Sequence, residues 1–342
     1  MIPQTIRRCC AWWVAFAVLG VASAAGPEIP RIRDIDVYGA GKIPAAQILR
    51  EAKLQAGEPL PVSKGELEDR ISKIAGIQRA RVEAVCCEGA DAILFVGVEE
   101  RNGAHAVFRS EPNGKSVLPA DLASDYEQFV DTVLDAVKQK ANSDAVKLST
   151  ADSARAFEAK FAAFTGGHLA ELRDVLRNSE DAGQRAIAVA VIGYAPKKGD
   201  VVDDLQFALQ DPDDTVRSNA MRSLRTLALA SSKNPASGVR VSPTWLIELL
   251  NSLVLSDRLG AADILVTLSD RHEEAVLDQM RERALPALAE MARWPSLRYA
   301  LPPFLLIGRI AGLDEQEIQL RWTNGEREKV IQKALTKPGR RK

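Results

Sequence analysis

Few side chains in this sequence have the chemistry that catalysis and metal binding usually need. The 342 residues include three histidines and four cysteines. His105, His168 and His272 have no partner at metal-ligand spacing, and no HExxH, CxxC or GxSxG motif occurs. We therefore predict no catalytic residues, no cofactor and no metal, and expect that the chain is not an enzyme.

Cysteine pairing cannot hold this fold together. Cys9 and Cys10 lie near the start of the chain, and the other two cysteines, Cys86 and Cys87, are adjacent. Adjacent cysteines cannot join distant segments, so the stability of the fold must come from buried apolar surface. Two interpretations of Cys86 and Cys87 stay open: a vicinal disulfide, or two small hydrophobic side chains on opposite faces of a strand.

The sequence also lacks an apolar run long enough to span a membrane. The longest run, residues 11–21, has about eleven residues, whereas a membrane helix needs roughly 18 to 20. Arg7 and Arg8 precede it, and the small residues Ala22, Ser23 and Ala24 follow it, which is the pattern of a secretory signal peptide. We predict that residues 1–24 are cleaved and that the protein is exported, to a periplasmic or outer-membrane-associated location. The alternative is an uncleaved signal anchor.

Positive charge is not in excess. The chain has 45 basic and 46 acidic residues, and removal of residues 1–24 takes away two arginines and no acid. A weakly acidic chain lacks the concentrated positive field that phosphate-backbone binding requires, so we predict no nucleic-acid partner. The basic tail, residues 336–342, is interpreted as a solvated end, with peripheral membrane contact at most.

A repeated pattern centres on residues 209–224. The pattern consists of Leu209, Arg217, Ala220 and Leu224. A step of 33 backwards gives Leu176, Gln184, Ile187 and Val191, and a step of 41 forwards gives Leu250, Arg258, Ala261 and Leu265. A further step of 40 gives Arg298, Leu301 and Leu305. A period near 40 is typical of two-helix repeats.

The repeats resemble those of HEAT-like proteins of the PBS-lyase type, which implies an all-α solenoid over residues 166–335. In HEAT-like repeats the Asp and Arg of this motif commonly link successive repeats. The resemblance therefore implies a structural ladder of Asp214, Arg217 and Arg258 rather than a catalytic role.

Residues 31–100 have a different pattern, which predicts strand, helix, helix, strand, strand. Ile35 and Val37 alternate with acids, as in a half-buried strand. Ser63 and Glu66 form a capping box before a helix. The fold class is therefore a small α+β domain (β-α-α-β-β) followed by the all-α solenoid. Residues 101–120 are predicted to be a linker or hairpin, and residues 121–165 a helical lead-in.

The first domain resembles the POTRA domains of outer-membrane assembly and secretion proteins. The matching residues are Ile35, Val37, Gly39, Ile48, Leu49, Gly57, Leu60, Gly76, Ile77, Val82, Val96, Val98 and Glu99. In that family an exposed sheet edge accepts extended segments by strand addition, which implies contacts at Leu94 and Val96 in the last strand. This chain has one such domain and no barrel-like alternation after it, so barrel insertion is not expected.

Trp294 is the other candidate for contact with a partner. It lies between Arg293 and Pro295 at an expected helix end, and Arg298 follows it. Aromatic and arginine side chains are enriched among the residues that dominate binding energy. We therefore predict an exported scaffold or adaptor that binds proteins of the cell envelope. The alternatives are an enzyme on a HEAT-like scaffold, resembling the bilin lyases, and a membrane-anchored accessory of secretion or division.

Overall fold

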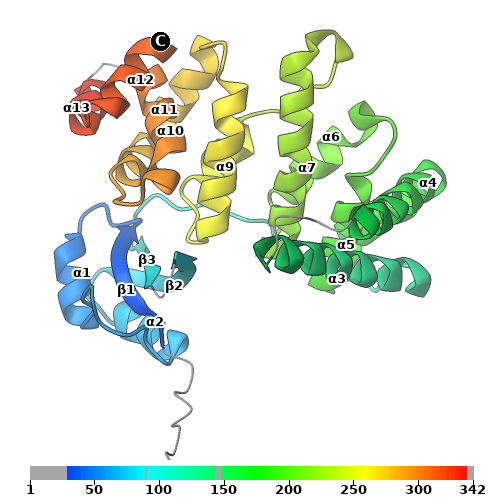
Figure 1. Cartoon of the computed structure of the whole chain (residues 1–342), viewed down its shortest axis with the longest axis horizontal. Helices are drawn as coiled ribbons and strands as arrows, with labels where there is room; N and C mark the ends of the chain where they lie inside the picture. The colour runs from blue at the N-terminus through cyan, green and yellow to red at the C-terminus, as the bar shows by residue number, and fades with distance from the viewer. Residues whose placement is uncertain (1–28, 89–90, 143–147, 337–342) are drawn as a thin grey trace, which may run out of the picture.

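The computed structural model describes residues 29–88, 91–142 and 148–336. It has two parts, a small α/β module and an array of paired helices, and the module lies against one end of the array (Figure 1). The predicted order of a small α+β domain followed by a helical repeat region is confirmed, and the sheet of that domain is mixed.

The α/β module has a three-stranded mixed sheet. Its elements are β1 (Arg31–Tyr38), α1 (Ala45–Ala52), α2 (Lys64–Ser72), β2 (Ile77–Glu88) and β3 (Asp91–Glu100). The strand order is β1-β3-β2, with β1 parallel and β2 antiparallel to β3. Ser63 caps α2 by accepting a hydrogen bond from the Glu66 amide at 3.2 Å. The chain reverses before β2 at Gly76, whose φ of 96° suits glycine.

Both faces of the sheet are buried. Val82, Leu94 and Val96 share a core with side chains of α1 and α2. On the other face, Tyr38 and Phe95 belong to the core of the helical array. This two-sided burial explains why β3 has an almost continuous apolar sequence instead of the alternation of a half-exposed strand.

The helical part begins at residue 120. Its helices are α3 (Ala120–Asn142), α4 (Leu148–Asn178), α5 (Ala182–Ile192), α6 (Val202–Ala208), α7 (Asp214–Lys233), α8 (Thr244–Leu249), α9 (Leu255–Leu268), α10 (Glu274–Ala292), α11 (Leu297–Ile310), α12 (Glu315–Thr323) and α13 (Arg327–Thr336). Consecutive helices pair as α6 with α7, α8 with α9 and α10 with α11, and α4 packs against α5. The second helices form one layer in the order α5, α7, α9, α11 (Figure 1).

Helix α4 departs from regular helical geometry near its middle. α4 breaks at His168, whose φ of −123° and ψ of 22° are not helical. The first part of α4 packs with α3 through an aromatic group that includes Phe129 and Phe161, whose rings are 5.6 Å apart. The part after the break supplies the buried Leu172 and Leu176, which begin the repeat core.

Candidate functional site

An arginine stands at the same place in three successive repeats. Arg185, Arg217 and Arg258 each lie four positions after the N-cap of α5, α7 and α9, respectively. Each donates a hydrogen bond to the carbonyl oxygen six residues earlier, at 3.0, 2.8 and 2.6 Å. Each guanidinium thereby holds the loop that enters its own helix.

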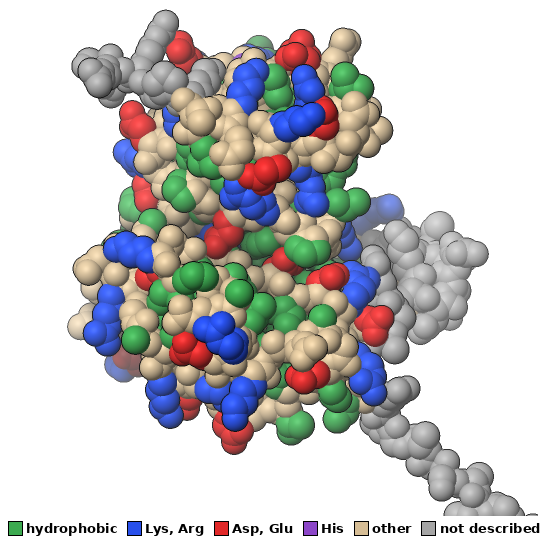
Figure 2. All heavy atoms as spheres, turned by 90° about the vertical axis from the view of Figure 1, so that its left-hand side faces the viewer, with side chains coloured by type: hydrophobic (Ala, Val, Ile, Leu, Met, Phe, Trp, Pro, Cys, Tyr) green, Lys and Arg blue, Asp and Glu red, His purple; other side chains and the backbone are tan. Residues whose placement is uncertain are grey.

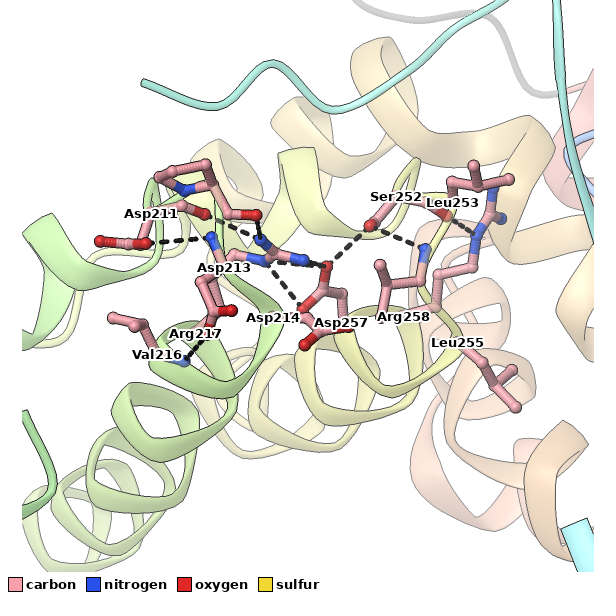
Figure 3. Close-up of polar contacts among 12 residues, drawn as sticks. Asp211, Asp213, Asp214, Val216, Arg217, Ser252, Leu253, Leu255, Asp257 and Arg258 are labelled. Atoms are coloured by element: carbon pink, nitrogen blue, oxygen red, sulfur yellow. Dashed lines mark hydrogen bonds and ion pairs between the residues drawn. The ribbon is translucent and has the colours of Figure 1, made fainter. Parts of the chain in front are cut away.

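The same arginines join one repeat to the next. Arg185 pairs with Asp211 at 2.9 Å, Arg217 with Asp257 at 2.7 Å, and Arg258 lies 3.6 Å from Glu290. We call these three pairs the arginine ladder. Figure 3 shows the Arg217 guanidinium between the backbone before α7 and the Asp257 carboxylate, which Ser252 also contacts.

The ladder is buried, and its electrostatics follow from that. The side chains of Arg217 and Asp257 are 1% and 0% exposed. Burial raises the pKa of Asp257, although the hydrogen bonds from Arg217 and Ser252 act in the opposite direction. Burial likewise lowers the pKa of Arg258 and raises that of Glu290. Such pairs depend on each partner, because one charge left alone in the interior is costly.

The residues expected in the ladder from the sequence need two corrections. The structure places Arg217 and Arg258 in it, but Asp214 lies outside and pairs with Arg81 of β2 at 2.8 Å. The acid that Arg217 meets, Asp257, was missed because it lies 40 residues away. The sequence signal that could have identified Arg185 is its spacing of 32 residues from Arg217, which is close to the repeat length.

The steps of 33 and 40 residues also misplaced the outer repeats. Gln184 lies one position before the ladder arginine Arg185 and instead receives a hydrogen bond from the Leu118 amide. In α11 the position four residues after the N-cap is Ala300, so Arg298 is not a ladder residue. Arg298 is exposed in the first turn of α11, and its guanidinium lies 5.8 Å from the centre of the Tyr299 ring.

Residues 101–119, which we call the strap, cross the ladder instead of spanning free space. The strap runs under α9 and α7 to reach α3 (Figure 1). The Arg109 amide donates to the Gln210 carbonyl at 2.9 Å, and its guanidinium pairs with Asp211. The Phe108 ring covers the Arg217 guanidinium at 4.0 Å. The expected linker is therefore a docked segment.

The α/β module is attached to the repeats through Tyr38 and the residues around it. The Tyr38 hydroxyl donates to the Leu253 carbonyl at 2.9 Å, and its ring lies 4.7 Å from the Arg258 guanidinium. The Gly39 amide donates to Glu290 at 2.9 Å. The third ladder pair, Arg258 and Glu290, is thus also a contact between the module and the array.

Trp294 is not an exposed contact, contrary to the expectation from the sequence. Its side chain is 3% exposed, and its ring packs 5.2 Å from Phe95 and 6.1 Å from Tyr38. The sheet covers this tryptophan, so a partner cannot reach it in this arrangement. Exposure at a helix end depends on what packs there, which the local sequence does not state.

The expectation for the sheet edge is also wrong in its choice of strand. Leu94 and Val96 lie in β3, which is paired on both sides, and their side chains are 2% and 0% exposed. The edge strands are β1 and β2. The start of β1 is covered by residues 57–60, where Ile32 exchanges backbone hydrogen bonds with Gly57 and Glu58. The outer edge of β2 is therefore the candidate for strand addition.

Cys86 and Cys87 belong to β2 in their backbone, but their side chains lie outside the described part of the structure, so the two interpretations of this pair stay predictions. The predicted signal at 1–24 and the end of the basic tail, residues 337–342, also lie outside the described residues. Within residues 29–88, 91–142 and 148–336, no helix is long and apolar enough to cross a membrane. In the same ranges no group of three or more His, Cys, Asp or Glu side chains is placed to hold a metal ion.

Comparison with known proteins gives a limited result. No protein-family model and no curated protein matches this sequence. Among solved structures, a designed armadillo repeat protein is similar, with a TM-score of 0.34 and 17% identity, over 54% of this chain and 92% of that one. A second designed armadillo repeat protein, in complex with the peptide (KR)4, has the same TM-score and coverage at 15% identity. Similarity at this level carries no argument about function.

Proposed function

We propose that this chain is an exported protein-binding scaffold of the cell envelope, in which a POTRA-like module takes up an extended segment and the helical array docks a second protein. Three observations support the proposal. The first is the order β-α-α-β-β with a β1-β3-β2 sheet. The second is the helical repeat array, an architecture that usually binds other macromolecules. The third is the signal-like start of the sequence.

The observation that carries the proposal is the outer edge of β2. The Val82 amide donates to the Glu68 carboxylate at 2.7 Å, which shows that it points away from β3. Backbone groups alternate in direction along a strand, so Ala80 and Ala84 share this outward direction. No other described strand pairs with this edge. An extended partner could bind the outward backbone groups of Ala80 and Ala84, and that of Val82 by displacing Glu68, whatever its own side chains, which suits a scaffold that takes several clients.

Site-specific photocrosslinking in cells tests the edge. A crosslinker at Gln78, exposed on β2, is expected to capture an envelope protein, and one at Asp69, exposed on α2, is not. Ala84→Pro removes an outward amide without breaking the ladder to β3, so it should abolish capture, whereas Ala84→Ser should preserve it. Equal capture by the proline and serine variants would exclude strand addition at β2.

Export has a separate test. The intact mass of the protein recovered from the envelope fraction should correspond to a chain that begins after Ala24. A mass that includes residues 1–24 would instead support the anchored alternative. This measurement does not depend on strand addition, so either half of the proposal can fail alone.

A further inference from the structure

A cavity of about 540 Å³ lies between the α/β module and the helical array. It is bounded by the end of β1, the turn at residues 39–41 and the helix α10. Figure 2 shows the face on which the module meets the last helices, where hydrophobic side chains gather between charged ones. This volume lies within the range of small-molecule sites in proteins, which is roughly 300 to 1,000 Å³.

Three buried polar atoms in the cavity wall have no hydrogen-bond partner. They are Asp36 Oδ2, Arg258 Nη1 and Trp294 Nε1, on side chains that are 3%, 2% and 3% exposed. Only two other such atoms occur among the described residues, so these three are concentrated here. A buried polar atom without a partner is costly, so three around one cavity are groups with which a polar ligand would form hydrogen bonds.

The three atoms differ in what they require. Arg258 Nη1 and Trp294 Nε1 are donors without an acceptor at hydrogen-bond distance, although Nη1 lies 3.6 Å from the Glu290 carboxylate. Asp36 Oδ2 accepts when the carboxyl is ionised. Burial, and to a smaller extent the charge of Asp34, raises the pKa of Asp36 to about 7, so the carboxyl has no cation nearby that offsets its burial.

The other charged groups of the wall are already engaged. Glu100 accepts hydrogen bonds from the amides of Lys42 and Ile43 at 2.7 to 2.9 Å. Glu290 accepts from the Gly39 amide and lies 3.6 Å from Arg258. The titratable and charged groups that line the cavity are Asp36, Glu100, Arg258, Glu290 and Arg293. Arg293 pairs with Glu328 at 2.8 Å. Asp36 is therefore the carboxyl of this wall with an oxygen that accepts no hydrogen bond from the described residues.

We propose that this cavity binds a small organic ammonium ion that also carries an oxygen acceptor. The ammonium group donates to Asp36, and the oxygen accepts from Arg258 and Trp294. The body of the ligand lies against the apolar part of the wall, which includes Val37, Ala45 and Ala287. An ammonium–carboxylate hydrogen bond is charge-assisted and stronger than a neutral one, so the amine contributes most to selectivity.

Calorimetric titration of the full chain with three probes tests this site. The probes are δ-aminovalerate, which carries both groups, pentylamine, which lacks the acceptor, and valerate, which lacks the amine. We expect δ-aminovalerate to bind best and valerate to bind at least about tenfold more weakly, because it leaves Asp36 unpaired. Binding should also weaken about tenfold from about pH 8.5 to about pH 6, because Asp36 becomes protonated.

A matched pair of variants assigns the binding to this cavity. Asp36→Asn should remove the preference for δ-aminovalerate over valerate. Asp34→Asn changes a neighbouring acid outside the cavity wall and should retain the preference. If Asp36→Asn does not fold, the pH dependence of the unchanged chain still tests the assignment. Equal affinity for δ-aminovalerate and valerate, or no binding of any probe at millimolar concentration, would overturn the proposal.

Discussion

Arg217→Ala removes the guanidinium that joins α7 to α9. Asp257 is fully buried, and it loses three hydrogen bonds, at 2.7, 3.0 and 3.1 Å. The carbonyl groups of Asp211 and Pro212 lose their donor, and the Phe108 ring loses the cation beneath it. Breaking a buried pair from one side costs about 3 to 5 kcal/mol, so we expect the free energy of unfolding to fall by about that much.

Urea titration of the full chain, followed by circular dichroism, measures the loss. Arg225→Ala is the matched control, because Arg225 joins the same two helices through Asp263 at 2.7 Å but on the surface, with side chains 60% and 40% exposed. A surface pair contributes about 1 kcal/mol or less. The buried arginine should therefore matter several times more than the exposed one.

The result that would refute this reasoning is a loss for Arg217→Ala no larger than that for Arg225→Ala. A double variant separates the buried charge from the lost packing. Arg217→Met with Asp257→Leu removes both charges and keeps apolar volume, so it should recover most of the stability lost in Arg217→Ala. If the double variant is less stable than Arg217→Ala, the loss of stability in Arg217→Ala comes from lost packing and not from an unpaired carboxylate.

Three further outcomes are expected. Gly97→Ala would place a Cβ 2.5 Å from the Tyr38 ring, so we expect the free energy of unfolding, measured by urea titration, to fall by roughly 1 to 3 kcal/mol. Gly65→Ala in α2 has no atom within 4 Å of its new Cβ and should raise the free energy of unfolding by about 1 kcal/mol. Equal effects of the two substitutions would contradict the packing. Phe108→Ala should loosen the strap and speed hydrogen exchange of the following amide, and unchanged exchange would argue against the stacking. Burial raises the pKa of Asp36 from 3.8 to about 7. The stability that depends on its protonation is therefore fully present below about pH 4 and is lost as the pH rises through 7. Asp36→Asn should therefore be more stable than the original chain near pH 8.5 and lose that advantage near pH 4, and identical urea midpoints for the two proteins at both pH values would contradict the shift.

Local patterns predicted several elements of the α/β module well, although Asp36, one of the acids expected on an exposed face of the first strand, is buried. The strand at Ile35 and Val37 and the helix capped by Ser63 follow from alternation and capping, which act within a few residues. The repeat alignment slipped by one residue at Gln184 because α5 is buried on nearly all sides, so its apolar residues do not mark one face. Neighbouring positions then match an apolar pattern equally well.

The candidate contacts failed for a different reason. Trp294 and Leu94 were expected at surfaces, and both are covered by segments far away in the sequence. A continuous apolar run such as that of β3 indicates burial on both faces, which could have warned against an edge position. The cavity beside Asp36 had no signal in the sequence, because its wall joins β1 to α10.

The sequence by itself determined which segments are strands and helices, that the helices repeat, and that arginines recur at their starts, because these properties depend on spacing along the chain. Only the tertiary structure decided that Arg217 meets Asp257, that Asp214 meets Arg81, that the strap covers the ladder, and that β2 is an edge strand of the sheet. The two ion pairs join residues that are 40 and 133 positions apart in the sequence. Which distant groups meet is set by how the sheet and the helices pack, and many pairings are compatible with the same local pattern.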